Sequence, residues 1–244
     1  MNQALVHRAL HFERIDSTNA EARRLAEAGE RGPVWIRADE QTGGRGRLGR
    51  SWVSELGNCY ATFMFPCEAP HTAVAQLSFV AAVAVHDAVV ALLPHLDPRI
   101  KWPNDLLLGG AKFCGILSET VTTAPLVVAI GCGINVAHAP QGTPYPVASL
   151  ESQCNVDSMF EALQASLSSC LQMWSDGTGF PAICKHWQRH AIGLDADCTT
   201  EQGAGIFRGL AEDGGLILER LDGSRKTIHS GDVRFASLEA MRQR

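Results

Sequence analysis

One glycine- and arginine-rich stretch, residues 43–50, limits the local fold more than any other part of this sequence. Its four glycines exclude a stable helix, because glycine costs about 1 kcal/mol per helical position relative to alanine. They also give a strand no side chains to pack. Glycines let backbone N–H groups approach a ligand closely, and arginines recognise carboxylates and phosphates. The stretch therefore predicts an anion-binding loop, or else a solvated basic turn or nucleic-acid patch.

Composition places the stretch in an ordinary globular chain. The 244 residues are 45% apolar and 19% charged, with a net charge of -5, which is typical of soluble proteins. This length allows one large domain, or one domain with a small appendage. General nucleic-acid binding usually needs a basic face, so the acidic balance argues against it.

The cysteines and the apolar segments indicate the compartment. The eight cysteines are dispersed without a Cys-x-x-Cys pair, so we expect reduced thiols packed in the core. The longest apolar segment, residues 74–93, carries Gln76, His86 and Asp87, which argues against a membrane span. No signal peptide is recognisable at Met1. We therefore expect a cytoplasmic protein without membrane association.

The order of apolar runs and breakers predicts a larger and a smaller domain, residues 1–192 and 193–244. In the first, residues 17–19 open a helix, with Thr18 and Glu21 at capping-box spacing. The predicted strands are 34–38, 59–65 and 126–130, with a hairpin over 106–120, and the predicted helices are 20–28, 74–93, 156–174 and 181–190. Residues 137–149 read as a long loop. Beyond Gly193, short alternating runs with tight turns indicate a small β-barrel.

Polar and glycine-rich clusters coincide with the predicted strand ends and turns. These clusters are residues 17–19, 41–52, 101–105, 112–119 and 131–135. They contain amides, cations and glycines but no clear nucleophile–base pair and no P-loop signature. The pattern favours catalysis by positioning and by stabilisation of developing negative charge.

Four motifs occur in a fixed order: Gly44-Arg45-Gly46-Arg47-Leu48-Gly49-Arg50-x-Trp52, Lys101-Trp102-Pro103-Asn104-Asp105, Lys112-x-x-Gly115-Ile116-Leu117-x-Glu119 and Gly131-x-Gly133-Ile134-Asn135. In order and spacing they resemble those of biotin–protein ligases, in particular bacterial biotin–[acetyl-CoA-carboxylase] ligases. The resemblance covers residues 11–190, and residues 193–237 resemble the family's Src-homology-3-like barrel. It implies an α+β fold with a mixed β-sheet backed by helices, similar to class II aminoacyl-tRNA synthetases.

The resemblance implies a two-step reaction. Biotin's carboxylate attacks the α-phosphorus of ATP, which enters with Mg²⁺, to give biotinyl-5′-AMP and pyrophosphate. A lysine of the biotin carboxyl carrier protein of acetyl-CoA carboxylase then takes the biotinyl group and releases AMP. No permanently bound cofactor is implied, and a homodimer is left open. The ligase-like pattern begins near Met1, so we expect no DNA-binding domain. The alternative function is a lipoate or octanoyl ligase or transferase, which the arginine-rich loop disfavours.

The resemblance also assigns roles to individual residues. The catalytic residues are Lys112, Arg45 and Arg47. The implied biotin-binding residues are Ser17, Thr18, Asn19, Gln41, Gly44, Arg45, Gly46, Arg47, Trp52, Lys112 and Gly115. The implied nucleotide-binding residues are Arg45, Arg47, Arg50, Trp52, Lys101, Asn104, Asp105, Lys112 and Asn135. Asp105 either holds Mg²⁺ or orients Lys112, and Arg234 weakly matches a family position near the active site.

Several of these residues also have a purely structural interpretation. The alternatives are helix capping for Ser17 and Thr18, turn capping for Asp105, a surface position for Lys112, and core packing for Trp52 and Trp102. We expect Trp102 in the core. We further expect loop 43–50 to act as a lid that is disordered before ligand binds, with residues 137–148 as a second mobile loop.

Overall fold

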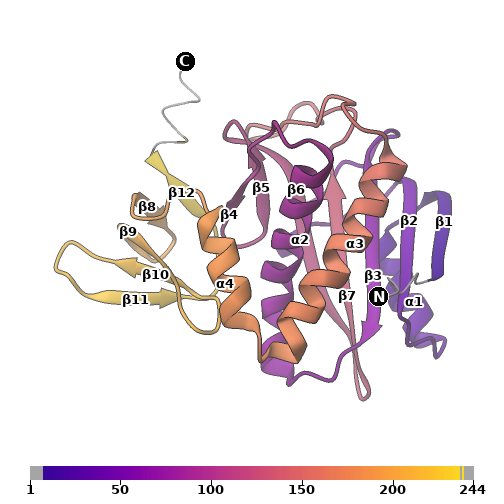
Figure 1. The fold of residues 1–244 in the computed structure, drawn as a ribbon, viewed down its shortest axis with the longest axis horizontal. Helices are drawn as coiled ribbons and strands as arrows, with labels where there is room; N and C mark the ends of the chain where they lie inside the picture. The colour runs from indigo at the N-terminus through magenta and orange to yellow at the C-terminus, as the bar shows by residue number, and fades with distance from the viewer. Residues whose placement is uncertain (1–7, 237, 239–244) are drawn as a thin grey trace.

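A mixed β-sheet of seven strands forms the centre of the molecule (Figure 1). The computed structural model describes residues 8–236 and 238. The strands lie in the order β1-β2-β3-β7-β6-β5-β4, and only the β1–β2 pair is parallel. Their bounds are β1 Arg8–Ile15, β2 Val34–Gln41, β3 Cys59–Pro66, β4 Arg99–Lys101, β5 Asp105–Leu108, β6 Ala111–Thr123 and β7 Leu126–Ile134. The predicted α+β fold with a mixed sheet is confirmed.

Helices cover both faces of this sheet unequally. On one face lie α2 (Leu77–Leu92), α3 (Val156–Trp174) and α4 (Phe180–Arg189), and α1 (Thr18–Glu27) packs on the opposite face (Figure 1). Short 3₁₀ turns occur at Arg47–Gly49, His71–Gln76 and Ser175–Gly177.

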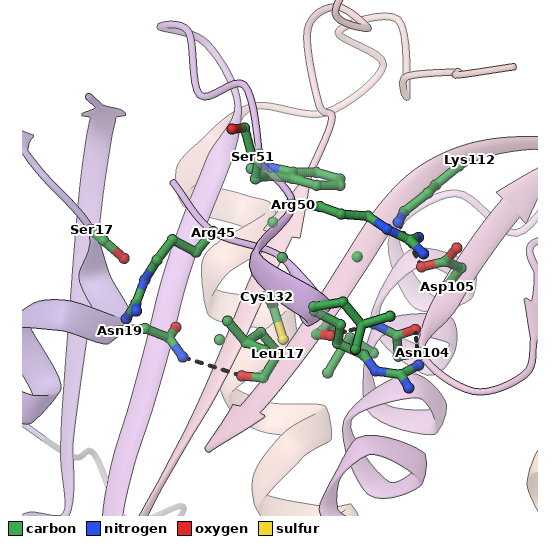
Figure 2. A pocket seen from close by; sticks show the side chains of 18 of the residues that line it. Ser17, Asn19, Arg45, Arg50, Ser51, Asn104, Asp105, Lys112, Leu117 and Cys132 are labelled. Atoms are coloured by element: carbon green, nitrogen blue, oxygen red, sulfur yellow. Dashed lines mark hydrogen bonds and ion pairs between the residues drawn. The ribbon is translucent and has the colours of Figure 1, made fainter. Parts of the chain in front are cut away.

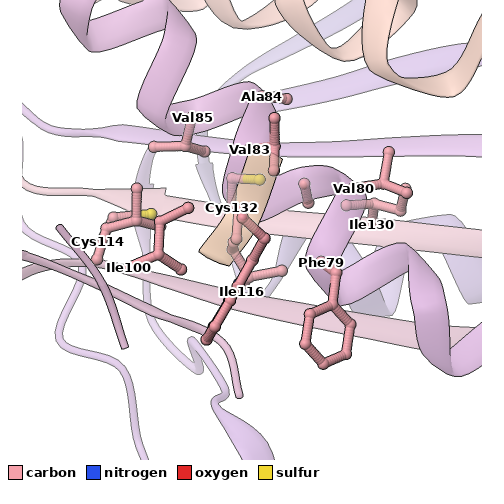
Figure 3. Packing of buried hydrophobic residues seen from close by; sticks show 14 of the residues in the cluster. Phe79, Val80, Val83, Ala84, Val85, Ile100, Cys114, Ile116, Ile130 and Cys132 are labelled. Atoms are coloured by element: carbon pink, nitrogen blue, oxygen red, sulfur yellow. The ribbon is translucent and has the colours of Figure 1, made fainter. Parts of the chain in front are cut away.

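Helix α2 is the buried central helix that its apolar sequence predicts. Val80 and Val83 pack against the sheet residues Ile130 and Cys132 (Figure 3). By length and composition alone, His71–Leu92 could cross a membrane, but 67% of its most apolar window is buried inside the protein. Its apolar character is therefore explained by the core.

Strand β7 divides its side chains between two environments, because successive residues of a strand point to opposite faces. The even-numbered residues from 128 to 134 belong to the large core beneath α2 and α3. On the other face, Val127 and Ala129 pack in the smaller core with α1. Gly131 and Gly133 continue that second face without side chains. This bare end of β7 leaves room for a site.

The C-terminal part forms a second, antiparallel sheet of five strands in the order β11-β10-β9-β8-β12. Its strands are β8 Asp197–Thr200, β9 Gly203–Leu210, β10 Leu216–Glu219, β11 Arg225–Ile228 and β12 Val233–Phe235. Within the described residues no ladder joins β11 to β12, so the predicted barrel is an open sheet there. Alternation of apolar residues predicts strands, whereas closure depends on the tilt and stagger of the whole set.

The two sheets share one hydrophobic core. The buried ring of Trp187 on α4 lies 5.7 Å from that of Phe79 on α2 and 6.4 Å from that of Phe207 on β9. Trp102 is buried, as expected, and its indole N–H donates to the Gly214 carbonyl at 3.1 Å. Division of the chain at residue 193 stays a prediction.

The N-terminus of α1 differs from its predicted form. Ser17 is the N-cap, and its hydroxyl accepts a hydrogen bond from the Ala20 N–H at 3.4 Å. Glu21 pairs with Arg24 at 2.7 Å, so the predicted capping box of Thr18 and Glu21 is wrong. A charged partner one turn away holds the Glu21 carboxylate on the helix surface. Strands β1 and β12 were also not predicted, because β1 lacks a regular alternation of apolar residues and β12 has only three residues.

The expectation of reduced, core-packing cysteines is confirmed. All eight thiols are free, and all but the half-buried Cys154 are buried. Burial raises the pKa of the Cys59 thiol to about 12, as expected for a group that must ionise away from water.

We predict that Trp187→Ala lowers the free energy of unfolding by about 3–5 kcal/mol, because it empties the junction between the sheets. Circular dichroism during urea unfolding measures this change. The control is Met173→Ala on α3, where the side chain is 42% exposed and the expected loss is below about 0.5 kcal/mol. Equal losses in both variants would contradict a shared core.

Candidate functional site

A pocket opens over the bare end of β7 and β6, between the start of α1 and the glycine–arginine loop (Figure 2). It brings together most of the predicted site residues: Ser17, Thr18, Asn19, Gln41, Arg45, Gly46, Arg47, Arg50, Trp52, Asn104, Asp105, Lys112 and Gly115. Gly44, Lys101 and Asn135 do not line it. Residues from all five polar clusters therefore meet in one place, the last cluster through Gly131 and Gly133.

The pocket floor consists of glycines on neighbouring strands. Gly115 on β6 pairs with Gly133 on β7. A Cβ atom would lie 2.9 Å from the Trp52 ring at Gly115 and 2.5 Å from the Trp52 indole nitrogen at Gly133. At Gly131 it would lie 2.0 Å from the Asn19 side-chain oxygen. Only glycine leaves room here for Trp52 and Asn19 to lie directly on the sheet.

Neutral polar groups converge at the α1 end of the pocket. The Gln41 Oε1 accepts from the Thr18 N–H at 2.8 Å and from the Thr18 hydroxyl at 3.1 Å. The Thr62 hydroxyl lies 2.8 Å from both the Thr18 hydroxyl and Asn19 Oδ1. The Asn19 amide donates to Glu119 at 2.8 Å. Such a network presents fixed donors and acceptors to a neutral polar ligand.

Thr62 was missed by sequence reasoning. It is a fully buried threonine in the apolar strand β3, and nothing local distinguishes it from a packing residue. Its partners are more than 40 residues away in the sequence.

Lys112 is a fixed cation at the opposite end of the pocket. Its Nζ lies 2.6 Å from Asp105 Oδ1, and its side chain is only 16% exposed. The same nitrogen lies 5.2 Å from the Trp52 ring centroid and 5.5 Å from that of Tyr145, distances typical of cation–π contacts. The surface position considered for Lys112 is therefore wrong.

The glycine–arginine loop spans the mouth of the pocket. Its base is closed by the Trp52 N–H, which donates to the Gly44 carbonyl at 2.9 Å. Gly44 is itself buried there, and a Cβ atom would lie 2.5 Å from the Trp52 carbonyl oxygen. Figure 2 shows Arg45 directed toward Asn19 and Arg50 directed toward Lys112 and Asp105. The loop therefore places cations at both ends of the pocket.

Arg47 enters the pocket from the same loop. Its Nη1 donates to Asn104 Oδ1 at 3.1 Å. Burial lowers the pKa of Arg47, and the negative charges of Asp232 and Asp105 partly offset this effect. A half-buried guanidinium of this kind meets an anion with little competition from water.

Asp232, the residue just before β12, completes the pocket wall. Its carboxylate pairs with Arg50. Burial raises the pKa of Asp232, but the hydrogen bond from Arg50 and the charges of Arg50, Lys101 and Arg47 outweigh it and leave the pKa lowered. Sequence reasoning reached this segment through Arg234, which is instead exposed on β12. Asp232 was missed, although it stands two residues earlier.

Asn135 and the loop that follows β7 hold one edge of the pocket in place through hydrogen bonds. Asn135 is fully buried, and its amide donates to the Ala148 carbonyl at 2.9 Å. Two further backbone bonds of 2.9 Å join Lys112 to Pro146 and to Ala148. These bonds bring Tyr145, another residue that was missed, into the pocket. Movement of this segment and of the glycine–arginine loop stays a prediction.

The chain is similar to known proteins over most of its length. The Biotin/lipoate A/B protein ligase family model matches residues 11–135, and the Biotin protein ligase C terminal domain model matches residues 200–235. A biotin–[acetyl-CoA-carboxylase] ligase of Paracoccus denitrificans is 40% identical over 237 residues, covering 91% of this chain and 98% of that protein.

A bifunctional ligase/repressor of Bacillus spizizenii is 32% identical, covering 96% of this chain and 74% of that protein. The solved structure of the Aquifex aeolicus biotin protein ligase in complex with biotin and ATP is also similar. It is 25% identical, with a TM-score of 0.79 and coverage of 94% of this chain and 99% of that one.

We predict that Asp232→Asn loosens the glycine–arginine loop, because the neutral amide no longer attracts Arg50. Both partners of this ion pair are about half exposed, so its loss is worth roughly 0.5–1 kcal/mol. The initial rate of trypsin cleavage after Arg47 or Arg50 should rise about two- to fivefold, as measured by mass spectrometry.

The matched control is Asp213→Asn, whose carboxylate pairs with His229 at 3.4 Å on the surface of the same part of the chain. Cleavage in the loop should be unchanged in this control. If Asp232→Asn also leaves the rate unchanged, the second sheet does not hold the loop.

Proposed function

The chain belongs to the biotin/lipoate A/B protein ligase family, and we propose that its pocket is the active site of a biotin–protein ligase. The enzyme joins biotin to ATP, giving biotinyl-5′-AMP and pyrophosphate, and then transfers the biotinyl group to a protein lysine. The observation that carries this proposal is the pairing of a neutral hydrogen-bonding end with a cationic end in one pocket.

The neutral end fits the ureido ring of biotin. That ring needs both donors and acceptors, which the Gln41, Thr18 and Asn19 network supplies. An analogue without these polar groups would leave the buried network unpaired, at a cost larger than one hydrogen bond normally contributes. Lipoate carries an apolar dithiolane ring in place of the ureido ring, so the network favours biotin.

The cationic end fits the reacting groups. Biotin's carboxylate oxygen forms a bond to the α-phosphorus, and the bond from that phosphorus to the pyrophosphate oxygen breaks. Negative charge gathers on the phosphoryl oxygens during this step. Lys112, held by Asp105 at 2.6 Å, is positioned to stabilise that charge, and Arg47 is positioned to do so from the loop.

The glycine–arginine loop is suited to protect the intermediate. Biotinyl-5′-AMP is a mixed anhydride that water hydrolyses, so the pocket must exclude solvent until the acceptor lysine arrives. Arg45 and Arg50 flank the pocket from the loop, and Trp52 lies across the glycine floor. In the second step, the lysine amine attacks the biotinyl carbonyl and AMP leaves.

Asp105 serves Lys112 better than it would serve a metal ion. The Lys112 ammonium lies 2.6 Å from the carboxylate oxygen, and Asp232 is paired with Arg50. Mg²⁺ requires several oxygen ligands and is usually carried by nucleotide phosphates. We therefore infer that Mg²⁺ enters as part of MgATP, bound by the phosphates of the nucleotide.

The acceptor and the compartment follow from the same proposal. The acceptor is the biotin carboxyl carrier protein of acetyl-CoA carboxylase, in keeping with the Paracoccus relative's name. Eight free thiols are typical of a reducing compartment, which supports the cytoplasm. The proposed reaction does not involve DNA. Formation of a homodimer stays a prediction.

The direct test uses the full chain with biotin, MgATP and a purified carrier domain. Intact-mass spectrometry should show one added biotinyl group, and labelled pyrophosphate should exchange into ATP only when biotin is present. Absence of both signals would refute the proposal. Exchange that depends on lipoate rather than biotin would establish the lipoate alternative.

We predict that Lys112→Ala and Arg47→Ala each lower biotin-dependent ATP–pyrophosphate exchange by about 10²–10³-fold, because each removes a cation facing the developing charge. The control is Lys226→Ala, since Lys226 is exposed on β11 in the second sheet. Tight biotin binding together with normal exchange in both variants would contradict these roles.

A further inference from the structure

Three imidazoles meet where α2 packs against α4, on the sheet face opposite the pocket. They belong to His86 on α2, His186 on α4 and His190 at the end of α4. One ring nitrogen from each lies within 4.8 Å of the others. No other group of three or more His, Cys, Asp or Glu residues meets this condition within residues 8–236 and 238.

The local sequence explains how two of these rings converge. His186 and His190 are four residues apart, so they lie one turn apart on the same face of α4. The ring centroids of His86 and His190 are 3.8 Å apart, and those of His186 and His190 are 5.4 Å apart. His-x-x-x-His is also the spacing with which helical zinc sites present two ligands.

Asp87 orients two of the three rings. Its Oδ1 lies 2.8 Å from His86 Nδ1 and 3.1 Å from His186 Nε2. Each of these imidazoles therefore has one nitrogen engaged by a carboxylate and a second nitrogen available. A carboxylate behind a ligating histidine fixes the ring's tautomer and orientation, and is the usual outer partner in such sites.

We propose that His86, His186 and His190 form a binding site for a divalent transition metal of the zinc class, with Asp87 as the outer-shell carboxylate. Ligand nitrogens around tetrahedral zinc lie about 3.3 Å apart, as follows from zinc–nitrogen distances of about 2.0–2.1 Å. The rings must approach by roughly 1 Å or more to reach this spacing. His186 and His190 are only partly buried, so an ion can reach them from solvent.

The site is structural rather than catalytic. Bound metal would join α2 to the end of α4, where the His190 carbonyl accepts from the Ile100 N–H of β4 at 2.8 Å. The chain then returns to β4, because the Ile192 N–H donates to the Ile100 carbonyl at 2.9 Å. The metal would thus stabilise the connection between the two sheets.

The test uses tag-free full-length protein titrated with Co²⁺ and with Zn²⁺. Co²⁺ should bind with one ion per chain and give visible d–d absorption without the thiolate-to-metal charge-transfer band that cysteine ligands produce. The double variant His186→Ala/His190→Ala should bind at least tenfold more weakly. The matched control, His71→Ala/His95→Ala, changes two exposed histidines and should bind normally.

Thermal unfolding provides the second readout. At a hundredfold excess of Zn²⁺ over the wild-type Kd, the melting temperature of the wild type and the control should rise by about 5–10 °C. A tenfold weaker site halves this stabilisation, so the double variant should show at most about half of the rise. His186→Gln, a milder change, guards against simple misfolding and should also reduce the rise. Equal Co²⁺ affinity in the double variant and control, a thiolate band, or no binding by the wild type would each overturn the proposal.

Discussion

The alternation of side chains along β7 is the constraint on which the rest of the structure depends. Successive residues of a strand point to opposite faces of the sheet, and in β7 one face packs in the core while the other forms part of the binding site. One face is apolar throughout and packs in the large core with α2 and α3. The other changes from Val127 and Ala129 beneath α1 to Gly131 and Gly133 beneath the pocket. The binding site is therefore built directly on a strand whose other face lies in the large hydrophobic core.

Charge is distributed along the pocket in a way that separates recognition from chemistry. Neutral groups at the start of α1 are mutually hydrogen bonded, so they are oriented before any ligand arrives. The cations at the other end are also held by carboxylates, Lys112 by Asp105 and Arg50 by Asp232. Preorganised groups lose little free energy to reorientation during reaction, which is the main advantage of such a site.

The second sheet has a larger part in this arrangement than its size suggests. It shares the core through Trp187 and contributes Asp232 to the pocket wall. The three histidines lie at the connection that leads into this sheet. Both the glycine–arginine loop and the helix packing are thus linked to the position of the C-terminal part.

The sequence by itself determined the family, the class of fold and most of the pocket. Motifs and apolar periodicity can be recognised within short segments of the chain, and the motifs at the strand ends meet in the folded sheet. Lys112, Arg47 and Trp52 were therefore identified correctly as pocket residues. Only the tertiary structure decided which distant residues join them. Thr62, Asp232 and the His86 contact with α4 carry no local signal, because their partners lie tens to more than a hundred residues away. Helix and strand periods specify which face a residue occupies, whereas packing decides what that face meets.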